Sequence, residues 1–120
     1  MDKMHTVKKN TEFSRIIHTG RYYKNDSYVI YIKDNKLNTY RFGISISKKL
    51  GNAVHRNKYK RQLRFIIDKY KKNYQNNFDY IIIIKDGFIS SNFQNKESSY
   101  TSLIEKINND MLRRNNEKQE

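Results

Sequence analysis

The chain has 120 residues, a formal net charge of +13 and no cysteine. These features exclude disulfide bonds and thiolate metal sites, and no apolar run is long enough to span a bilayer or to serve as a signal peptide. We therefore expect one cytoplasmic domain over residues 1–120, with frayed ends at 1–9 and 113–120, and a phosphate-rich partner.

A short helix is the first element predicted. Its cap is Asn10 or Thr11, and Gly20 ends it. Its apolar side chains recur at i, i+3 and i+4 and are Phe13, Ile16 and Ile17.

Alternating residues predict two strands next, over residues 28–33 and 41–47. In the first strand, Tyr28, Ile30 and Ile32 share one face. One face of the second strand is apolar, and the other is shallow and polar because it consists of Gly43, Ser45 and Ser47. We therefore expect one side of the sheet to be open to a partner rather than covered by a packed core.

The second half of the chain predicts a helix, a buried strand and a final helix. Asn52 can cap a helix that runs to about Tyr74, and its apolar stripe consists of Tyr59, Leu63, Ile66, Ile67 and Tyr70. The strand covers residues 79–85, is central and is buried on both faces; the last helix covers about 96–113. A further strand is expected near 22–26 or 88–93. The fold class is α+β, with the order α-β-β-α-β-α around a roughly four-stranded sheet and a βαβ crossover.

Positive charge is concentrated between Asn35 and Ile67. This stretch contains no Asp or Glu and nine basic side chains: Lys36, Arg41, Lys48, Lys49, Arg56, Lys58, Lys60, Arg61 and Arg64. Like charges crowded on one surface repel, so without partners in the chain an external polyanion is their natural compensation.

The spacing of these side chains suits a phosphate backbone. Arg56, Lys60 and Arg64 stack at i, i+4 and i+8, about 6 Å apart, on a helix face separate from the apolar stripe. Arginine pairs bidentately with phosphate. Lys48 and Lys49 lie ahead of the helix N-terminus, where free N–H groups attract anions. The sequence therefore predicts a nucleic-acid-binding segment.

Residues 47–64, Ser-Lys-Lys-Leu-Gly-Asn-Ala-Val-His-Arg-Asn-Lys-Tyr-Lys-Arg-Gln-Leu-Arg, resemble the signature of the bacterial ribonuclease P protein component, which carries an Arg-Asn-Arg motif. The resemblance extends from the first helix through the strand ending at Lys85. It implies the protein subunit of a ribonucleoprotein whose RNA removes the 5′ leader of precursor tRNA. It also implies a ribosomal-protein-like sandwich with a left-handed βαβ crossover, although general rules favour the right-handed form.

The resemblance also implies partners and site residues. The partners are the catalytic RNA and precursor tRNA, without a membrane or a small-molecule substrate; Mg²⁺ belongs to the RNA, and no cofactor is expected on protein side chains. The catalytic-RNA contacts are Lys48, Lys49, Gly51, Asn52, Arg56, Asn57, Lys58, Lys60, Arg61 and Arg64. A separate cleft for the leader consists of Phe13, Ile17, Tyr31, Ser45 and Ser47. Lys58 replaces the second Arg of the motif, and Ile17 stands where many relatives have Phe.

Two other functions remain open from the residues alone. A ribosomal or RNA-chaperone module could use the same fold without any enzyme. A stand-alone nuclease could use His5, His18 or His55, but no paired carboxylate or lysine motif accompanies these histidines. Ordinary surface histidines are the better interpretation. No catalytic residue is therefore predicted in this chain.

Overall fold

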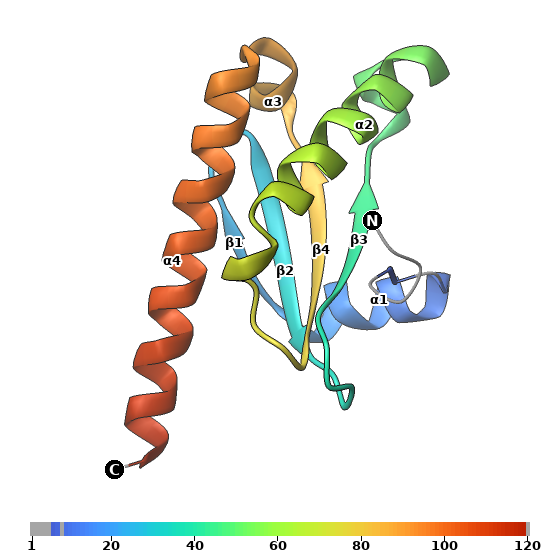
Figure 1. The fold of residues 1–120 in the computed structure, drawn as a ribbon. Helices are drawn as coiled ribbons and strands as arrows, with labels where there is room; N and C mark the ends of the chain where they lie inside the picture. Colours follow the sequence, from blue (N-terminus) through green and yellow to red (C-terminus); the bar gives the residue numbers. More distant parts are fainter. Residues whose placement is uncertain (1–5, 8, 120) are drawn as a thin grey trace.

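The computed structural model describes residues 6–7 and 9–119, the last three of them by their backbone alone. Four strands form one sheet in the order β1-β2-β4-β3 (Figure 1). Their bounds are Arg21–Lys24 for β1, Tyr28–Asp34 for β2, Arg41–Ser45 for β3 and Phe78–Ile84 for β4. β4 is central, since it pairs antiparallel with β2 and parallel with β3.

Helices cover both faces of this sheet. Helix α1 spans Asn10–Thr19, α2 spans Ala53–Lys69, α3 spans Asp86–Ser90 and α4 spans Phe93–Gln119. In Figure 1, α2 and α4 lie over one face and α1 lies behind the other. Helix α2 connects the parallel strands β3 and β4, so the predicted βαβ crossover is confirmed. Its left-handed sense stays a prediction.

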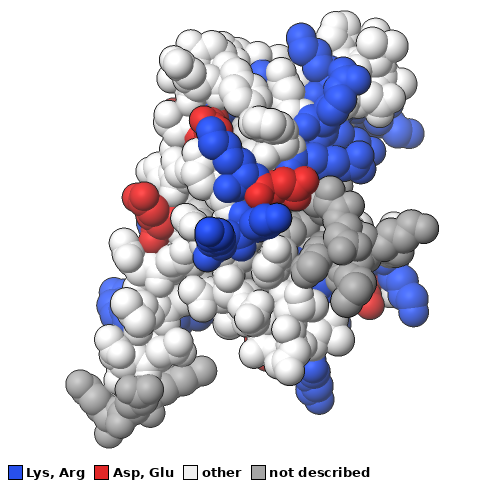
Figure 2. Space-filling view, in the orientation of Figure 1, with Lys and Arg blue, Asp and Glu red and all other residues white. Residues whose placement is uncertain are grey.

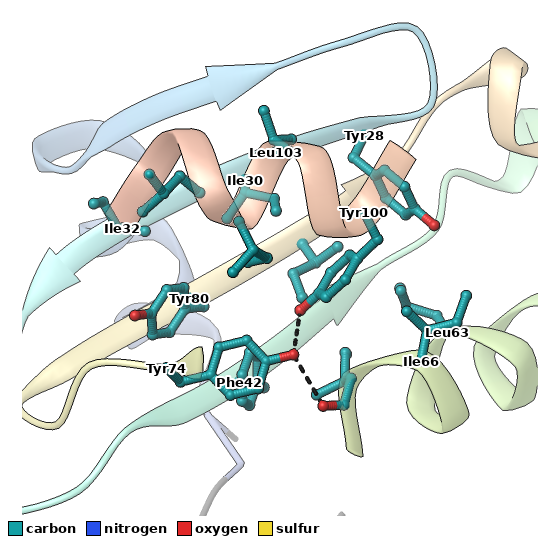
Figure 3. Close-up of a cluster of buried hydrophobic side chains, with 14 of the residues drawn as sticks. Tyr28, Ile30, Ile32, Phe42, Leu63, Ile66, Tyr74, Tyr80, Tyr100 and Leu103 are labelled. Carbon is teal, nitrogen blue, oxygen red and sulfur yellow. Dashed lines mark hydrogen bonds between the residues drawn. The ribbon is translucent and has the colours of Figure 1, made fainter. Parts of the chain in front are cut away.

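The larger core lies between the sheet and helices α2, α3 and α4 (Figure 3). Tyr28, Ile30 and Ile32 of β2 are at most 2% exposed and share this face, as their alternation predicted. Leu63, Ile66 and Ile67 meet them from α2, while Tyr59 and Tyr70 pack at the edge. The predicted apolar stripe of α2 is therefore confirmed.

Buried tyrosines form a hydrogen-bonded group inside this core. The Tyr74 hydroxyl donates to the Ile67 carbonyl oxygen at 2.9 Å and lies 2.6 Å from the Tyr100 hydroxyl (Figure 3). Burial raises the pKa of both tyrosines well above the usual range. Because their hydroxyls have hydrogen-bond partners, these rings can fill the core without leaving a buried polar atom unsatisfied.

The opposite face of the sheet is partly covered, which corrects the expectation of an open face. Helix α1 forms a second cluster there, in which Val7, Ile16 and Ile81 are buried. Gly43 is also buried, and a Cβ atom added to it would lie 2.4 Å from Cζ of Phe13. Phe13 therefore occupies the shallow space that glycine leaves in β3.

Several predicted boundaries differ from the observed ones. Strand β3 ends at Ser45 rather than Ser47, because the Ser47 hydroxyl accepts the Lys49 amide and starts a 3₁₀ turn. Helix α2 ends at Lys69 rather than Tyr74, since a separate turn at Lys71–Asn73 brings Tyr74 back into the core. Helix α1 begins after Lys9, with no side-chain cap from Asn10 or Thr11.

The further strand exists at β1, one of the two expected places. The other place, residues 88–93, forms α3 and the start of α4 instead. Asp86 lies in the first turn of α3, where a carboxylate favours helix, and Phe88 packs edge-on against Tyr28. The Phe88 ring is therefore buried from a short helix. The apolar content of a short segment cannot by itself distinguish a helix from a strand.

Both ends of the chain contact or continue regular structure where the structure describes them, and their fraying stays a prediction. The Val7 amide donates to the Phe42 carbonyl at 2.7 Å. Helix α4 begins at Phe93, with the Asn95 amide on the Asn92 side chain, and continues past Arg113. Two ion pairs from Asp110, to Arg113 and Arg114, support its last turns. Residues 1–5, 8 and 120 of the predicted frayed ends lie outside the described residues.

Candidate nucleic-acid interface

Five basic side chains of α2, together with Asn57, form a charged surface, here called the docking stripe: Arg56, Asn57, Lys58, Lys60, Arg61 and Arg64. Asn57, Lys58, Arg61 and Arg64 are exposed, while Arg56 and Lys60 are half-buried. Among the described residues, none of the ion pairs involves residues 48–64. Figure 2 shows blue side chains gathered over the end of α2 that begins at Ala53. The stripe is therefore an uncompensated positive surface.

The loop before α2 is held by its own backbone and side chains. Gly51 has a φ of 149°, a backbone conformation that residues with a Cβ atom rarely adopt. Asn52 caps α2, as predicted, through Oδ1, which accepts the His55 amide at 3.0 Å. Arg56 Nε donates to the Gly51 carbonyl at 3.2 Å. Gly51 and Asn52 thus shape the loop, and Arg56 is oriented by it.

The 3₁₀ turn ahead of this loop presents two further lysines. Ser47 caps the turn by accepting the Lys49 amide at 3.2 Å, and the side chains of Lys48 and Lys49 are exposed. Ser47 therefore supports the lysines rather than the sheet face on which the strand alternation placed it. Lys48 and Lys49 extend the positive surface beyond α2.

Arg41 does not belong to this free surface, which corrects its place among unpartnered charges. Its Nε and Nη2 atoms donate to the two carboxylate oxygens of Asp79, both at 2.8 Å, and Nη1 donates to Glu12 at 3.1 Å. The Asp79 side chain is fully buried. These hydrogen bonds raise the pKa of Arg41. Asp79 is therefore the structural partner of Arg41.

The leader face predicted from the sequence lies on the side of the sheet that α1 partly covers. Tyr31 of β2 and Gly43 of β3 both pair with Ile81 of β4, so they form one row across the sheet. Phe13 lies over Gly43, and Tyr31 remains half-buried beside them. Ser45 is in the next row, half-buried. Four of the five predicted leader residues, Phe13, Ile17, Tyr31 and Ser45, are therefore brought to this face.

Tyr22 belongs to the same face, although it was not among the predicted site residues. It pairs with Tyr31 across β1 and β2, the two ring centroids lie 5.7 Å apart, and Tyr22 is 58% exposed. Its neighbour Lys24 also points to this face, since side chains two apart in a strand share a side. The sequence predicted a possible strand at residues 22–26. It could not place Tyr22 beside Tyr31, because that position depends on how β1 pairs with β2.

A cavity of about 310 Å³ brings the two predicted surfaces together. Phe13 and Gly43 line it from the leader face, and Lys60 and Arg64 line it from α2. The aromatic face and the docking stripe thus meet beside the edge strand β3. The two predicted surfaces are therefore adjacent in the fold.

Histidines and carboxylates form no chemical centre in the described part of the chain. His18 and His55 are exposed, and their Nδ1 atoms lie 2.7 Å from the Ser14 carbonyl and 3.0 Å from Asn52 Oδ1. His5 lies outside the described residues. Within residues 6–7 and 9–119, no group of three or more His, Asp or Glu could hold a metal ion, and no helix is long and apolar enough to cross a membrane.

An α+β sandwich is typical of a nucleic-acid-binding protein when it carries a basic helix stripe without ion pairs among the described residues and a neighbouring aromatic sheet face. Comparison with known proteins makes this class specific: the family model described as Ribonuclease P matches residues 1–108. The chain therefore belongs to the ribonuclease P protein family, and its role is that of a protein subunit of ribonuclease P. The predicted resemblance is confirmed.

Individual relatives agree with this assignment. The chain is 38% identical over 99 residues to the ribonuclease P protein component of Mesoplasma florum, covering 82% of this chain and 90% of the relative. A solved Staphylococcus aureus RNase P protein, a mutant with defective mRNA degradation activity, is 35% identical with a TM-score of 0.80, covering 86% and 87%. The Thermotoga maritima RNase P protein is 25% identical with a TM-score of 0.77, covering 84% and 96%.

Proposed function

We propose that this subunit performs two binding tasks and no chemistry. The docking stripe, with Lys48 and Lys49, binds the catalytic RNA of ribonuclease P. The sheet face at Phe13, Tyr31 and Ser45 holds the single-stranded 5′ leader of precursor tRNA. The observation that carries this proposal is the cavity at which Lys60 and Arg64 of the stripe meet Phe13 of the aromatic face.

The docking stripe suits a folded RNA because its contacts are made through charge. Arg61 and Arg64 are exposed and form no ion pair with another described residue, so they can donate bidentately to phosphate groups. Gly51 and Asn52 fix the loop and the helix start, so Arg56 and its neighbours are presented in one orientation. A preordered surface loses less conformational entropy on binding than a flexible one.

The aromatic face suits unpaired nucleotides. Tyr31 and Tyr22 present partly exposed rings side by side, and unpaired bases stack on such rings in any sequence. Lys24 lies beside them and can accompany the phosphates of the same strand. A leader crossing the sheet from Phe13 toward β1 would therefore meet rings and then a cation.

The chemistry is assigned to the RNA subunit in this proposal. The resemblance places Mg²⁺ on that RNA, where it supplies the activation of water for phosphodiester hydrolysis. The protein's part is to hold the precursor so that its cleavage site stays aligned with the RNA, and we place this activity in the cytoplasm.

Reconstitution tests the proposal directly. The purified protein, a ribonuclease P RNA and a precursor tRNA are combined at low Mg²⁺, and 5′ cleavage is measured with each component omitted in turn. We expect cleavage at the mature 5′ end only when the RNA subunit is present, and stimulation by the protein. Cleavage by the protein alone would establish a stand-alone nuclease. RNA binding without stimulation would favour a ribosomal or chaperone module.

A further inference from the structure

Phe65 and Phe93 form an exposed pair of aromatic rings at the junction of α2 and α4. Their ring centroids lie 5.9 Å apart with an interplanar angle of 57°, and the two residues remain 59% and 37% exposed. Neither residue belongs to the docking stripe or to the leader face. Paired exposed rings are a stronger sign of an interaction site than single scattered apolar residues.

Two positive side chains lie on the same side of α2 as Phe65. Lys58 and Arg61 precede Phe65 by seven and four residues, so they lie on the same side of α2. Both are exposed and take part in none of the ion pairs formed among the described residues. Lys69, four residues further on, pairs with Glu97 at 2.8 Å. The charges that precede Phe65 on this side of α2 are therefore cations, whereas the acidic side chain of Asp68 follows Phe65 by three residues.

A buried ammonium group lies behind the same surface. Lys96 is 6% exposed, and its Nζ donates to Gln62 Oε1 at 3.0 Å and lies 4.6 Å from the centroid of the Phe88 ring. Among the described residues it takes part in no ion pair, and burial lowers its pKa. Gln62 and Phe65 are three residues apart, as are Phe93 and Lys96. Lys96 therefore adds a further basic side chain at the junction of α2 and α4.

We propose that Phe65, supported by Phe93, stacks one unpaired base of the catalytic RNA while Lys58 and Arg61 contact the flanking phosphates. This inference rests on the proposed function, because it adds a third contact to the assembly with that RNA. A ring placed between cations combines the two interactions by which proteins bind unpaired nucleotides, namely stacking and charge. The contact differs from the leader face because it belongs to the RNA subunit rather than to the precursor.

A protein partner fits this surface less well. A second copy of the chain carries the same net charge of +13, so its approach would be repelled. A stable protein interface buries about 1,200 Å² or more, whereas one aromatic side chain contributes only about 150–250 Å². Two partly exposed rings match the face of a single base better than the core of an interface.

The test measures the affinity of the full chain for ribonuclease P RNA at several salt concentrations. Phe65→Leu keeps an apolar side chain but removes the ring, and we expect it to weaken binding roughly 5- to 150-fold, the scale of one lost stack. Phe65→Trp keeps an aromatic ring and should bind the RNA with wild-type affinity. The salt dependence should stay unchanged, since no charge is removed. Leu112→Ala, at another exposed apolar residue, is the matched control and should have no effect.

Chemical probing of the RNA provides a second readout. Wild-type protein should protect one unpaired nucleotide that becomes reactive with Phe65→Leu and stays protected with Leu112→Ala. Unchanged affinity and protection in Phe65→Leu, while Arg61→Ala weakens binding, would overturn this inference and leave the proposed function standing. If neither variant weakens binding, the proposed function itself fails. Loss of self-association in Phe65→Leu without a change in RNA affinity would identify a protein interface instead.

Discussion

Arg41 and Asp79 are cross-strand partners that tie β3 to β4 near the start of both strands. The two residues are directly paired in the parallel register, and both Asp79 oxygens accept from the Arg41 guanidinium at 2.8 Å. Asn35 donates to the same carboxylate at 2.8 Å, from the turn after β2. Arg41 also contacts Glu12, so the pair connects α1 with the sheet.

Arg41→Ala should therefore destabilise the protein rather than weaken its RNA contacts. The change leaves the buried Asp79 carboxylate without its charged partner, and losing one member of such a pair costs about 3–5 kcal/mol. Urea denaturation measures this loss. Lys36→Ala, an exposed lysine from the same basic stretch, is the control and should leave stability unchanged. The double variant Arg41→Ala with Asp79→Asn should recover part of the loss, and a purely additive double variant would contradict this coupling.

Arg61→Ala should weaken binding to the catalytic RNA with little change in stability. Arg61 is exposed and forms no ion pair with another described residue, so roughly 1–3 kcal/mol of binding free energy should be lost with one charge-assisted contact. The slope of log affinity against log salt should fall by about 0.7–0.9. Arg56→Ala is a less clean test because Arg56 also holds the Gly51 carbonyl.

Lys106→Ala is the matched control for Arg61→Ala. Lys106 is exposed on α4, so its loss changes the net charge equally at another surface. If both variants weaken binding to the same extent, the RNA responds to total charge only, and the docking stripe is not a site.

Changing the histidines should leave cleavage intact. In the reconstituted complex, we expect His5→Gln, His18→Gln and His55→Gln together to keep the cleavage rate within a few-fold of wild type. The Nδ1 atoms of His18 and His55 lie against oxygens of their own helix or its cap, and no proton transfer is assigned to them. A loss of roughly a hundredfold or more, the effect of removing a general base, would revive a protein-based nuclease.

Alkaline pH should destabilise the fold through its buried tyrosines. Burial raises the pKa of Tyr28, Tyr74 and Tyr100, and that of Tyr80 to about 12. An unfolded tyrosine releases its proton near pH 10, so above this pH the folded state binds more protons and stability falls as pH rises. Lys96 has the opposite effect on stability. Because its pKa is lowered, the folded state binds fewer protons than the unfolded state, and stability rises with pH until the unfolded lysine also loses its proton. Because four buried tyrosines oppose this one lysine, we expect a net loss of stability above pH 10.

Urea midpoints between pH 8 and 11.5, measured together with tyrosinate absorbance, check this expectation. Tyr80→Phe removes one of the linked protons and should flatten the decline by up to about 1.4 kcal/mol per pH unit above pH 10. If all ten tyrosines of the chain ionise before the helical circular dichroism is lost, the tyrosine core does not control alkaline stability.

Periodicity predicted those parts of the fold that depend on neighbours in sequence. The alternation of Tyr28, Ile30 and Ile32 and the apolar stripe at Leu63, Ile66 and Ile67 gave the correct buried faces, because each pattern reports the geometry of its own element. The same stripe placed Arg61 on the exposed side of α2. The concentration of basic side chains on α2 could also be predicted, because it depends only on residues close together in the sequence.

Pairings across the fold could not be predicted from the sequence. Arg41 was counted with the free cations because its partner Asp79 lies 38 positions away, and a charge count carries no distance information. Tyr22 stayed unassigned because its position beside Tyr31 depends on the register of β1 and β2. Phe65 meets Phe93 only because α2 and α4 pack side by side.

Tyr31→Ala should weaken the binding of precursor tRNA selectively in the assembled complex. A stacked base is worth roughly 1–3 kcal/mol, so the ratio of precursor to mature tRNA affinity should fall by about 5- to 150-fold. Mature tRNA has no leader, and its affinity should not change; assembly with the catalytic RNA should also stay normal. Tyr31 is a better choice than Phe13, whose ring fills the space above Gly43, so that Phe13→Ala would also disturb packing.

Two further variants locate the contact on the sheet. Tyr31→Phe keeps the ring and should keep the affinity ratio, whereas Tyr22→Ala should reduce it only for leaders long enough to reach β1, where Tyr22 lies 5.7 Å from Tyr31 by ring centroids. A series of precursors with leaders of increasing length measures both effects. If the ratio is unchanged in Tyr31→Ala for every leader length, the leader does not cross this face, and the leader-binding part of the proposed function fails.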